Sequence, residues 1–222
     1  MSEDGVAAAG AEPGAERRSG RRPKGVVRSG LVRAGVELAR SGGPGAVTLR
    51  EATRIVGVAP NAAYRHFADR DALLNAVCAE AMRSLVERMD HELGLVTARP
   101  GSKDRAVARL GAVGTAYLGF AASEPGLFDT VFAVPGHLRF AEGLSDGDAE
   151  GRTPLSVLNG VLDELVIAGA LPAERRPDAE FTVWSCVHGM AMLRNHGPLR
   201  DMPQAANAAL ADALFAFILR GL

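Results

Sequence analysis

Apolar residues recur at helical spacing through most of the chain, and no segment of useful length alternates apolar and polar residues as a strand does. The first predicted helix begins at Val26. The residues of its apolar face recur at i, i+4, i+7 and i+11: Val27, Leu31, Ala34 and Leu38. This helix is expected to end before the Gly-Gly-Pro-Gly segment at 42–45.

A second helix is predicted to start after Thr48, which is placed as its N-cap. Glu51 follows three residues later, so the pair has the spacing of a capping box. The side chains that this helix is expected to bury are Leu49, Ala52, Ile55 and Val56. Gly57 ends the helix as a C′ glycine. Pro60 suits the first turn of a third, short helix, predicted from Pro60 to about Phe67.

The rest of the chain also follows a helical pattern. Asp69 is expected to cap a long fourth helix reaching about Leu93, with an apolar face formed by Leu73, Leu74, Val77, Ala81, Leu85 and Met89. Further helices are predicted at 104–122, 125–132, 154–169, 178–195 and 204–219, with a long loop at 135–152. The sequence therefore predicts an all-α fold of about nine helices.

The charge is distributed unevenly along the chain. The net charge is −1, yet residues 17–74 hold twelve basic and four acidic residues, a net charge of +8. Residues 1–16 carry −4, and residues 75–222 carry −5. A compact basic segment beside an acidic body favours a nucleic-acid-binding module joined to a second unit. A solvated charge run is the alternative.

The predicted order is a helix, a short turn that contains glycine, and a short helix with a polar face. This order is typical of a helix-turn-helix. Ala63 and Phe67, four residues apart, can anchor the short helix to the core. The residues left to face outward are Asn61, Ala62, Arg65 and His66. Asn61 has the donor and acceptor for adenine N6 and N7, and Arg65 has the paired donors for guanine O6 and N7.

Three motifs in this region resemble the N-terminal domain of the TetR family of bacterial transcriptional regulators. They are Gly57-Val58, the Y-x-H-F stretch at 64–67 and the helix start at 70–74. The resemblance covers about residues 26–74. Arg70 replaces the more usual lysine, and the segment at 60–63 replaces the commoner Ser-x-x-x-[LIV] opening.

The resemblance implies a set of DNA-contacting residues. Thr48 and Arg50 would meet the backbone or a base, and the groove would hold Pro60, Asn61, Ala62 and Arg65. The phosphate contacts would come from Tyr64, His66 and Arg70. A half-buried aromatic is the alternative for Tyr64, and a helix-end cap for His66. The basic arm at 17–24 would enter a minor groove or follow phosphates, or else remain a solvated tail.

In TetR-like proteins the remaining helices bind a small ligand and dimerise through the last two helices. The stretches at 118–128 and 181–191 are similar to a C-terminal subclass with a W-x-x-x-H-G motif. Aromatic side chains with a few polar groups suit a pocket for a small, largely apolar ligand. The candidate pocket residues are Tyr117, Phe120, Phe128, Phe132, Trp184 and His188. A plain core with a hydrogen-bonded histidine is the alternative.

The apolar stripes expected to form a homodimer interface contain Met190, Leu193, Leu210, Leu214, Phe217 and Ile218. The resulting division is a disordered arm at 1–24, a DNA-binding domain at 25–74 with its last helix continuing to about 93, and a ligand-binding and dimerisation domain at 75–222.

No enzyme motif, metal-ligand spacing, cofactor motif, secretory signal or membrane-length apolar run is found, and two distant cysteines fit a reducing cytoplasm. We therefore expect a cytoplasmic regulator that binds double-stranded operator DNA, a repressor released by its ligand. The alternative is a ligand-independent helical DNA-binding or adaptor protein with a non-specific or structural role.

Overall fold

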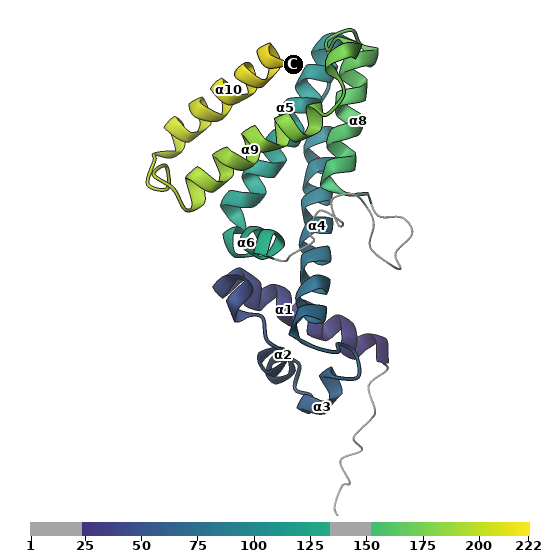
Figure 1. Ribbon diagram of the computed structural model, residues 1–222, viewed down its shortest axis with the longest axis vertical. Coiled ribbons are helices and arrows are strands. Elements are labelled where there is room, and N and C mark those ends of the chain that lie inside the picture. Colours follow the sequence, from purple (N-terminus) through teal and green to yellow (C-terminus); the bar gives the residue numbers. More distant parts are fainter. Residues whose placement is uncertain (1–23, 134–151) are drawn as a thin grey trace, which may run out of the picture.

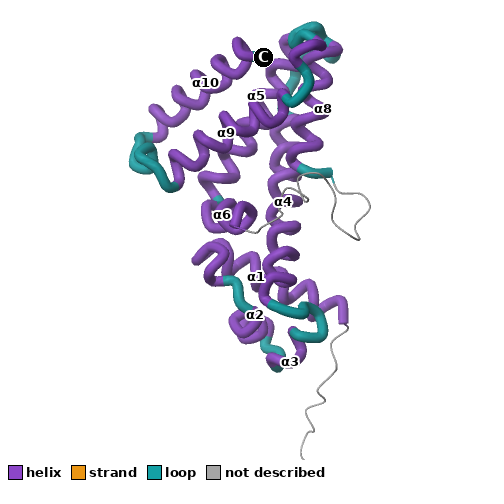
Figure 2. Tube along the Cα trace, in the orientation of Figure 1, coloured by secondary structure: helices purple, strands orange, loops and turns teal. Residues whose placement is uncertain are grey.

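The computed structural model describes residues 24–133 and 152–222, and within them it is all-helical (Figure 2). The predicted arm, apart from Lys24, and almost all of the predicted loop at 135–152 lie outside this range. The α-helices are α1 (Lys24–Ala46), α2 (Leu49–Val56), α3 (Pro60–Ala63), α4 (Arg70–Gly94), α5 (Lys103–Ser123), α6 (Pro125–Ala133), α8 (Pro154–Ile167), α9 (Ala179–Asn195) and α10 (Gln204–Gly221). A short 3₁₀ helix spans Ala173–Arg175. The described part of the chain thus holds nine α-helices and no strand, which confirms the predicted fold class.

Helix α4 forms the spine of the molecule (Figure 1). Its first turns pack in a head made of α1, α2 and α3, and its later turns run between the helices of the body. Asp69 caps it as predicted, because its carboxylate accepts a hydrogen bond from the backbone N–H of Ala72 at 2.8 Å. The predicted apolar face is buried, and the buried side chains of head and body join in one hydrophobic cluster.

The predicted end of the first helix is confirmed by a break in its backbone. Gly42 and Gly43 leave helical geometry, and Gly43 has φ +64°, a left-handed value that favours glycine. The helical stretch that carries the apolar face therefore stops at Ser41, and one short turn follows before α2.

Helix α2 begins as predicted but buries a different set of side chains. The Thr48 hydroxyl accepts the backbone N–H of Glu51 at 3.2 Å, which confirms the N-cap. The Glu51 carboxylate pairs with Arg54 at 2.8 Å, so the structure shows an N-cap and an ion pair at this helix start. The predicted burial of Ile55 is wrong, since its side chain is 47% exposed and Thr53 is buried in its place. Ile55 lies six residues after Leu49, and at 3.6 residues per turn this position is rotated by about 120° from the side of the helix that faces the core.

The Cys78 thiol lies buried between α4 and α6, where its Sγ donates to the Thr130 carbonyl oxygen at 3.4 Å. Burial raises the pKa of the Cys78 thiol to about 12. The folded state therefore holds this proton over a pH range in which the unfolded chain has lost it.

We expect the stability contributed by this protonated thiol to be intact below about pH 8.5, the ordinary thiol pKa, and to be lost as the pH rises toward 12. Urea unfolding at several alkaline pH values measures the loss, whose limiting slope is about 1.4 kcal/mol per pH unit for one group. The Cys78→Ala variant is the control, because it should show a shallower decline than the wild type. Equal slopes would contradict this assignment.

Candidate nucleic-acid interface and apolar cavity

The short helix of the head is anchored as the sequence predicts, but it is shorter. The α-helix ends at Ala63, and Tyr64–His66 continue as a turn in which the N–H of His66 donates to the Ala63 carbonyl at 2.8 Å. Ala63 is fully buried and Phe67 nearly so. These two side chains fix the orientation of the segment against the core.

The predicted groove residues lie on the outer side of this anchor. Asn61, Tyr64 and Arg65 are exposed, while Ala62 and His66 are partly exposed. Tyr64 is 61% exposed, which disfavours the half-buried aromatic as its role. Their polar atoms are available to an external partner, as base and phosphate contacts require.

The two DNA contacts predicted at the start of α2, Thr48 and Arg50, differ in how far their side chains are free to bind DNA. Arg50 is exposed, and so is Pro60 at the start of α3. Thr48 is partly buried, and its hydroxyl already accepts the N–H of Glu51. A phosphate or base at Thr48 would therefore share the hydroxyl with the helix cap.

The structure gives Arg70 an internal role that the sequence did not indicate. Its Nε donates to the Val47 carbonyl at 2.9 Å, and its guanidinium also donates to the Pro44 carbonyl. It thereby ties the start of α4 to the connection between α1 and α2. A second basic residue, Arg28, lies over the Phe67 ring at 5.4 Å and was missed by the motif, because its position on α1 has no fixed spacing from α3.

Helix α6 joins the body to the head. A Cβ on Gly126 would lie 2.2 Å from the Ala39 carbonyl oxygen, so the backbones of α6 and α1 touch at this point. Beside it, Arg40 Nε donates to the Glu124 carboxylate at 2.9 Å. The sequence does not predict the contact of Gly126 or the Arg40–Glu124 ion pair, since nothing in the local sequence shows which residues meet a distant helix.

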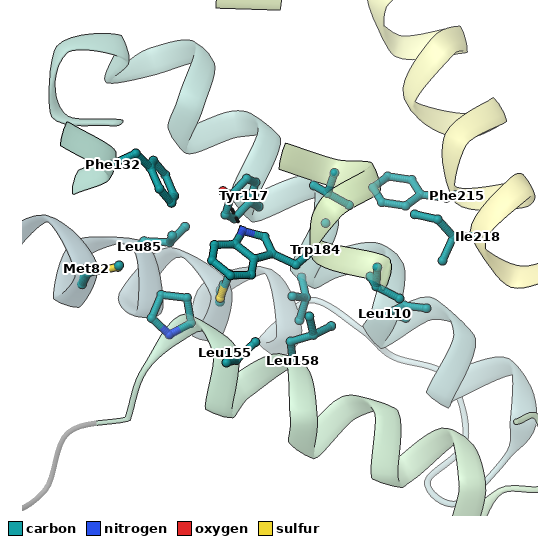
Figure 3. A pocket seen from close by; sticks show the side chains of 16 residues that line it. Met82, Leu85, Leu110, Tyr117, Phe132, Leu155, Leu158, Trp184, Phe215 and Ile218 are labelled. Atoms are coloured by element: carbon teal, nitrogen blue, oxygen red, sulfur yellow. Dashed lines mark hydrogen bonds between the residues drawn. The ribbon is translucent and has the colours of Figure 1, made fainter. Parts of the chain in front are cut away.

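The body holds an apolar cavity of about 60 Å³ between α4, α5, α6, α8, α9 and α10 (Figure 3). Its lining includes Met82 and Leu85 of α4, Phe132 of α6 and Leu158 of α8. The polar side-chain atoms among the lining residues are the Tyr117 hydroxyl and the Trp184 indole N–H. The cavity is thus almost wholly apolar.

Those two polar groups satisfy each other. Trp184 Nε1 donates to the Tyr117 hydroxyl oxygen at 3.1 Å, and this hydroxyl lies 2.9 Å from His188 Nδ1. Burial raises the pKa of the Tyr117 phenol well above its usual range, so the phenol stays protonated and uncharged. The tautomer of the His188 ring decides which of the two groups donates in this hydrogen bond.

The structure brings five of the six candidate pocket residues together. Tyr117, Phe132 and Trp184 line the cavity. His188 lies behind them, with its ring centroid 4.5 Å from that of Phe132 and 5.5 Å from that of Phe128. Phe120 is buried in the core and is not among the lining residues. Figure 3 shows Tyr117 and Trp184 joined by their hydrogen bond.

Removing the shared hydroxyl should loosen this cluster. The Tyr117→Phe variant keeps the ring but leaves the Trp184 N–H and His188 Nδ1 without their partner, so we expect a loss of about 1–3 kcal/mol in the free energy of unfolding. Because Trp184 is the single tryptophan of the chain, its fluorescence spectrum reports the change directly. An unchanged spectrum with unchanged stability would show that the hydrogen bonds contribute nothing.

The predicted dimer stripes are partly used inside the chain. Met190 and Ile218 are buried, and Leu210 and Leu214 pack partly against the core. These four side chains belong at least partly to the chain's own interior. The large apolar side chains that α9 and α10 leave exposed are Phe181, Met192, Leu193, Phe217 and Leu219.

Two protein-family models match this chain, one over the head and one over the body. The model of bacterial regulatory proteins of the tetR family matches residues 31–77, and the model of a tetracyclin repressor-like C-terminal domain matches residues 110–218. The chain belongs to the TetR family. As a TetR-family protein it is a DNA-binding transcriptional regulator and not an enzyme. The C-terminal match includes the 118–128 and 181–191 stretches, and membership of the W-x-x-x-H-G subclass stays a prediction.

Solved structures share the TetR-family fold along most of the chain. A protein with unknown function from Rhodococcus sp. RHA1 has a TM-score of 0.71 at 21% identity, covering 93% of this chain and 99% of its own. The TetR family transcriptional regulator PfmR from Thermus thermophilus has a TM-score of 0.52 at 20% identity, covering 86% and 98%. A regulatory protein in the tetR family from Rhodococcus RHA1 has a TM-score of 0.55 at 18% identity, covering 87% and 95%. No curated protein sequence matches the chain.

In residues 24–133 and 152–222, no helix is both long and apolar enough to cross a lipid bilayer. The same residues contain no group of three or more His, Cys, Asp or Glu side chains that could hold a metal ion.

Proposed function

We propose that this TetR-family regulator is a repressor that leaves its operator when a small apolar ligand occupies the body cavity. The observation that carries the proposal is the position of α6. One end of this helix contributes Phe132 to the cavity wall, and near the other end Gly126 packs on the backbone of α1. A ligand that shifts Phe132 therefore acts on a helix in direct contact with the head.

The head, proposed as residues 25–74, reads DNA with the exposed side of α3 and the turn that follows. Asn61 and Arg65 contact base edges beside Pro60 and Ala62, while Tyr64 and His66 hold phosphates. Arg50 and Thr48 contribute from the start of α2. Arg70 serves mainly by holding the connection between α1 and α2, with its remaining donor capacity directed to a phosphate. The high exposure of Asn61, Tyr64 and Arg65 supports these roles.

The body, proposed as residues 75–222, binds the ligand and forms the dimer. TetR-family regulators bind operator DNA and dimerise. We assign the interface of this chain to α9 and α10, because both helices leave large apolar side chains exposed, among them Phe181, Leu193 and Phe217. A two-fold dimer presents two α3 segments to half-sites about 34–36 Å apart, or to a longer overlapping site.

The ligand is small, uncharged and largely apolar. Burying a charge in a cavity without a partner costs far more than apolar contacts return, and the Tyr117, Trp184 and His188 polar atoms already bond one another. An ionised ligand would have to break that set to be accepted.

Footprinting on the DNA upstream of the protein's own coding region tests the proposal. We expect a protected segment that disappears steeply with salt, by about 0.9 log unit of affinity per phosphate neutralised for each tenfold rise in salt. Uncharged apolar compounds that change Trp184 fluorescence should abolish the protection. Protection that persists when the cavity is filled would refute ligand release, and sequence-indifferent protection would favour the non-specific alternative.

A further inference from the structure

Helix α10 forms one wall of the cavity, and it differs from α5, α8 and α9 in the side-chain hydrogen bonds that join it to its neighbours. Arg109 of α5 forms two hydrogen bonds with Glu164 of α8, at 2.6 and 3.0 Å. Tyr117 of α5 bonds both Trp184 and His188 of α9. Between α10 and the other described helices, in contrast, no side-chain hydrogen bond or ion pair is present. Within one subunit, α10 is therefore held against the other described helices by apolar packing.

Two side chains do this packing at the cavity. Ile218 is the buried residue of α10, with 5% of its surface exposed, and it lines the cavity beside Phe215. The Phe215 ring rests directly on Gly114 of α5, since a Cβ there would lie 2.1 Å from Phe215 Cε1. Only a glycine in α5 leaves room for the ring at this depth.

The lining side chains lie on two sides of Trp184. Figure 3 places Met82, Leu85 and Phe132 on one side of Trp184, with Phe215 and Ile218 on the other. At about 60 Å³ the void is well below the roughly 300–1,000 Å³ of typical ligand sites. A ligand must therefore displace lining side chains, which on the α10 side are Phe215 and Ile218.

We propose that Phe215 closes the α10 end of the cavity and sets the length of ligand that the protein accepts. The ligand class is then an uncharged molecule with a linear apolar part, lying past Trp184 with its far end against Phe215. This inference rests on the proposed function only in taking the cavity as the ligand site. Beyond the proposed function, it identifies Phe215 as the residue that determines which ligand lengths are accepted.

A series of linear 1-alkanols, titrated into the full-length protein and followed by Trp184 fluorescence, tests the inference. In the wild type the affinity should rise about fourfold per methylene and then stop rising once the chain reaches Phe215. In the Phe215→Ala variant the rise should continue for about three more carbons, because the ring volume becomes available to the chain. Ile167→Ala is the control, since Ile167 lies at the end of α8, another helix of the cavity wall, with 86% of its surface exposed and no place in the lining.

The Phe215→Leu variant guards against a loss of folding, because it keeps an apolar side chain over Gly114. It should move the length limit by about one or two carbons, between the wild type and Phe215→Ala. The same limit in all variants, or a series that leaves Trp184 fluorescence unchanged, would overturn the inference. If the limit moves but no alkanol weakens DNA binding, the assignment of Phe215 stands and ligand release of the repressor is refuted.

Discussion

The Arg65→Ala variant is expected to lose preference at one base position of the operator while keeping its affinity for unrelated DNA nearly unchanged. Arg65 is exposed beside the buried anchors Ala63 and Phe67, so its removal leaves the head folded. A bidentate contact from arginine to guanine contributes about 1–3 kcal/mol of discrimination. Fluorescence anisotropy with the operator and with each single-base variant of it measures the effect, and Asn61→Ala should relax a different position.

Tyr64→Ala is the matched comparison for these two variants. Its hydroxyl is assigned to a phosphate, so its loss should weaken binding to all duplexes by a similar factor and leave the sequence preference intact. If Arg65→Ala, Asn61→Ala and Tyr64→Ala weakened every duplex equally, the assignment of α3 to the groove would be wrong.

The second large effect is expected from Gly126→Ala. The added methyl would lie 2.2 Å from the Ala39 carbonyl oxygen and 2.8 Å from that of Arg40, and both are backbone atoms that cannot rotate away. Overpacking of this kind costs about 1–3 kcal/mol, more than the gain of up to about 1 kcal/mol from replacing glycine in a helix. We therefore expect a net loss of up to about 2 kcal/mol in the free energy of unfolding, measured in urea.

Gly160→Ala is the control for this prediction. Gly160 lies in α8 with nothing within 4 Å of its Cβ position, so alanine should stabilise the protein by up to about 1 kcal/mol. Gly126→Ala should also displace α6 from α1 and weaken the effect of cavity occupancy on DNA affinity. The role given to α6 would be contradicted if Gly126→Ala and Gly160→Ala both stabilised the protein and cavity occupancy still changed DNA affinity as in the wild type.

Local signals in the sequence were sufficient for the helices and for the head. Caps such as Thr48 and Asp69 act through hydrogen bonds within three residues, and Gly57 ends α2 through its own backbone conformation, φ +72°. The Ala63 and Phe67 anchors follow from helical spacing alone. Ile55 is exposed although apolar, because its position six residues after Leu49 lies off the core face of α2, and its apolar character alone does not reveal this.

The contacts that join helices could not be predicted in the same way. Gly126 and Gly114 resemble any other helical glycine until the helix facing them is known, and Phe215 was one of several apolar residues in α10. The aromatic cluster was found because aromatics are scarce and Trp184 and His188 share a helix face. Which of its members line the cavity depends on side-chain packing between distant segments.

Selection of bound DNA from a pool of random duplexes tests directly whether the exposed side of α3 reads specific DNA as part of a two-fold dimer. We expect the wild type to enrich a two-fold symmetric sequence, and Asn61→Ala to enrich the same sequence with one position per half-site relaxed. A selected pool as random as the starting pool, or one that Asn61→Ala and Arg65→Ala leave unchanged, would contradict it.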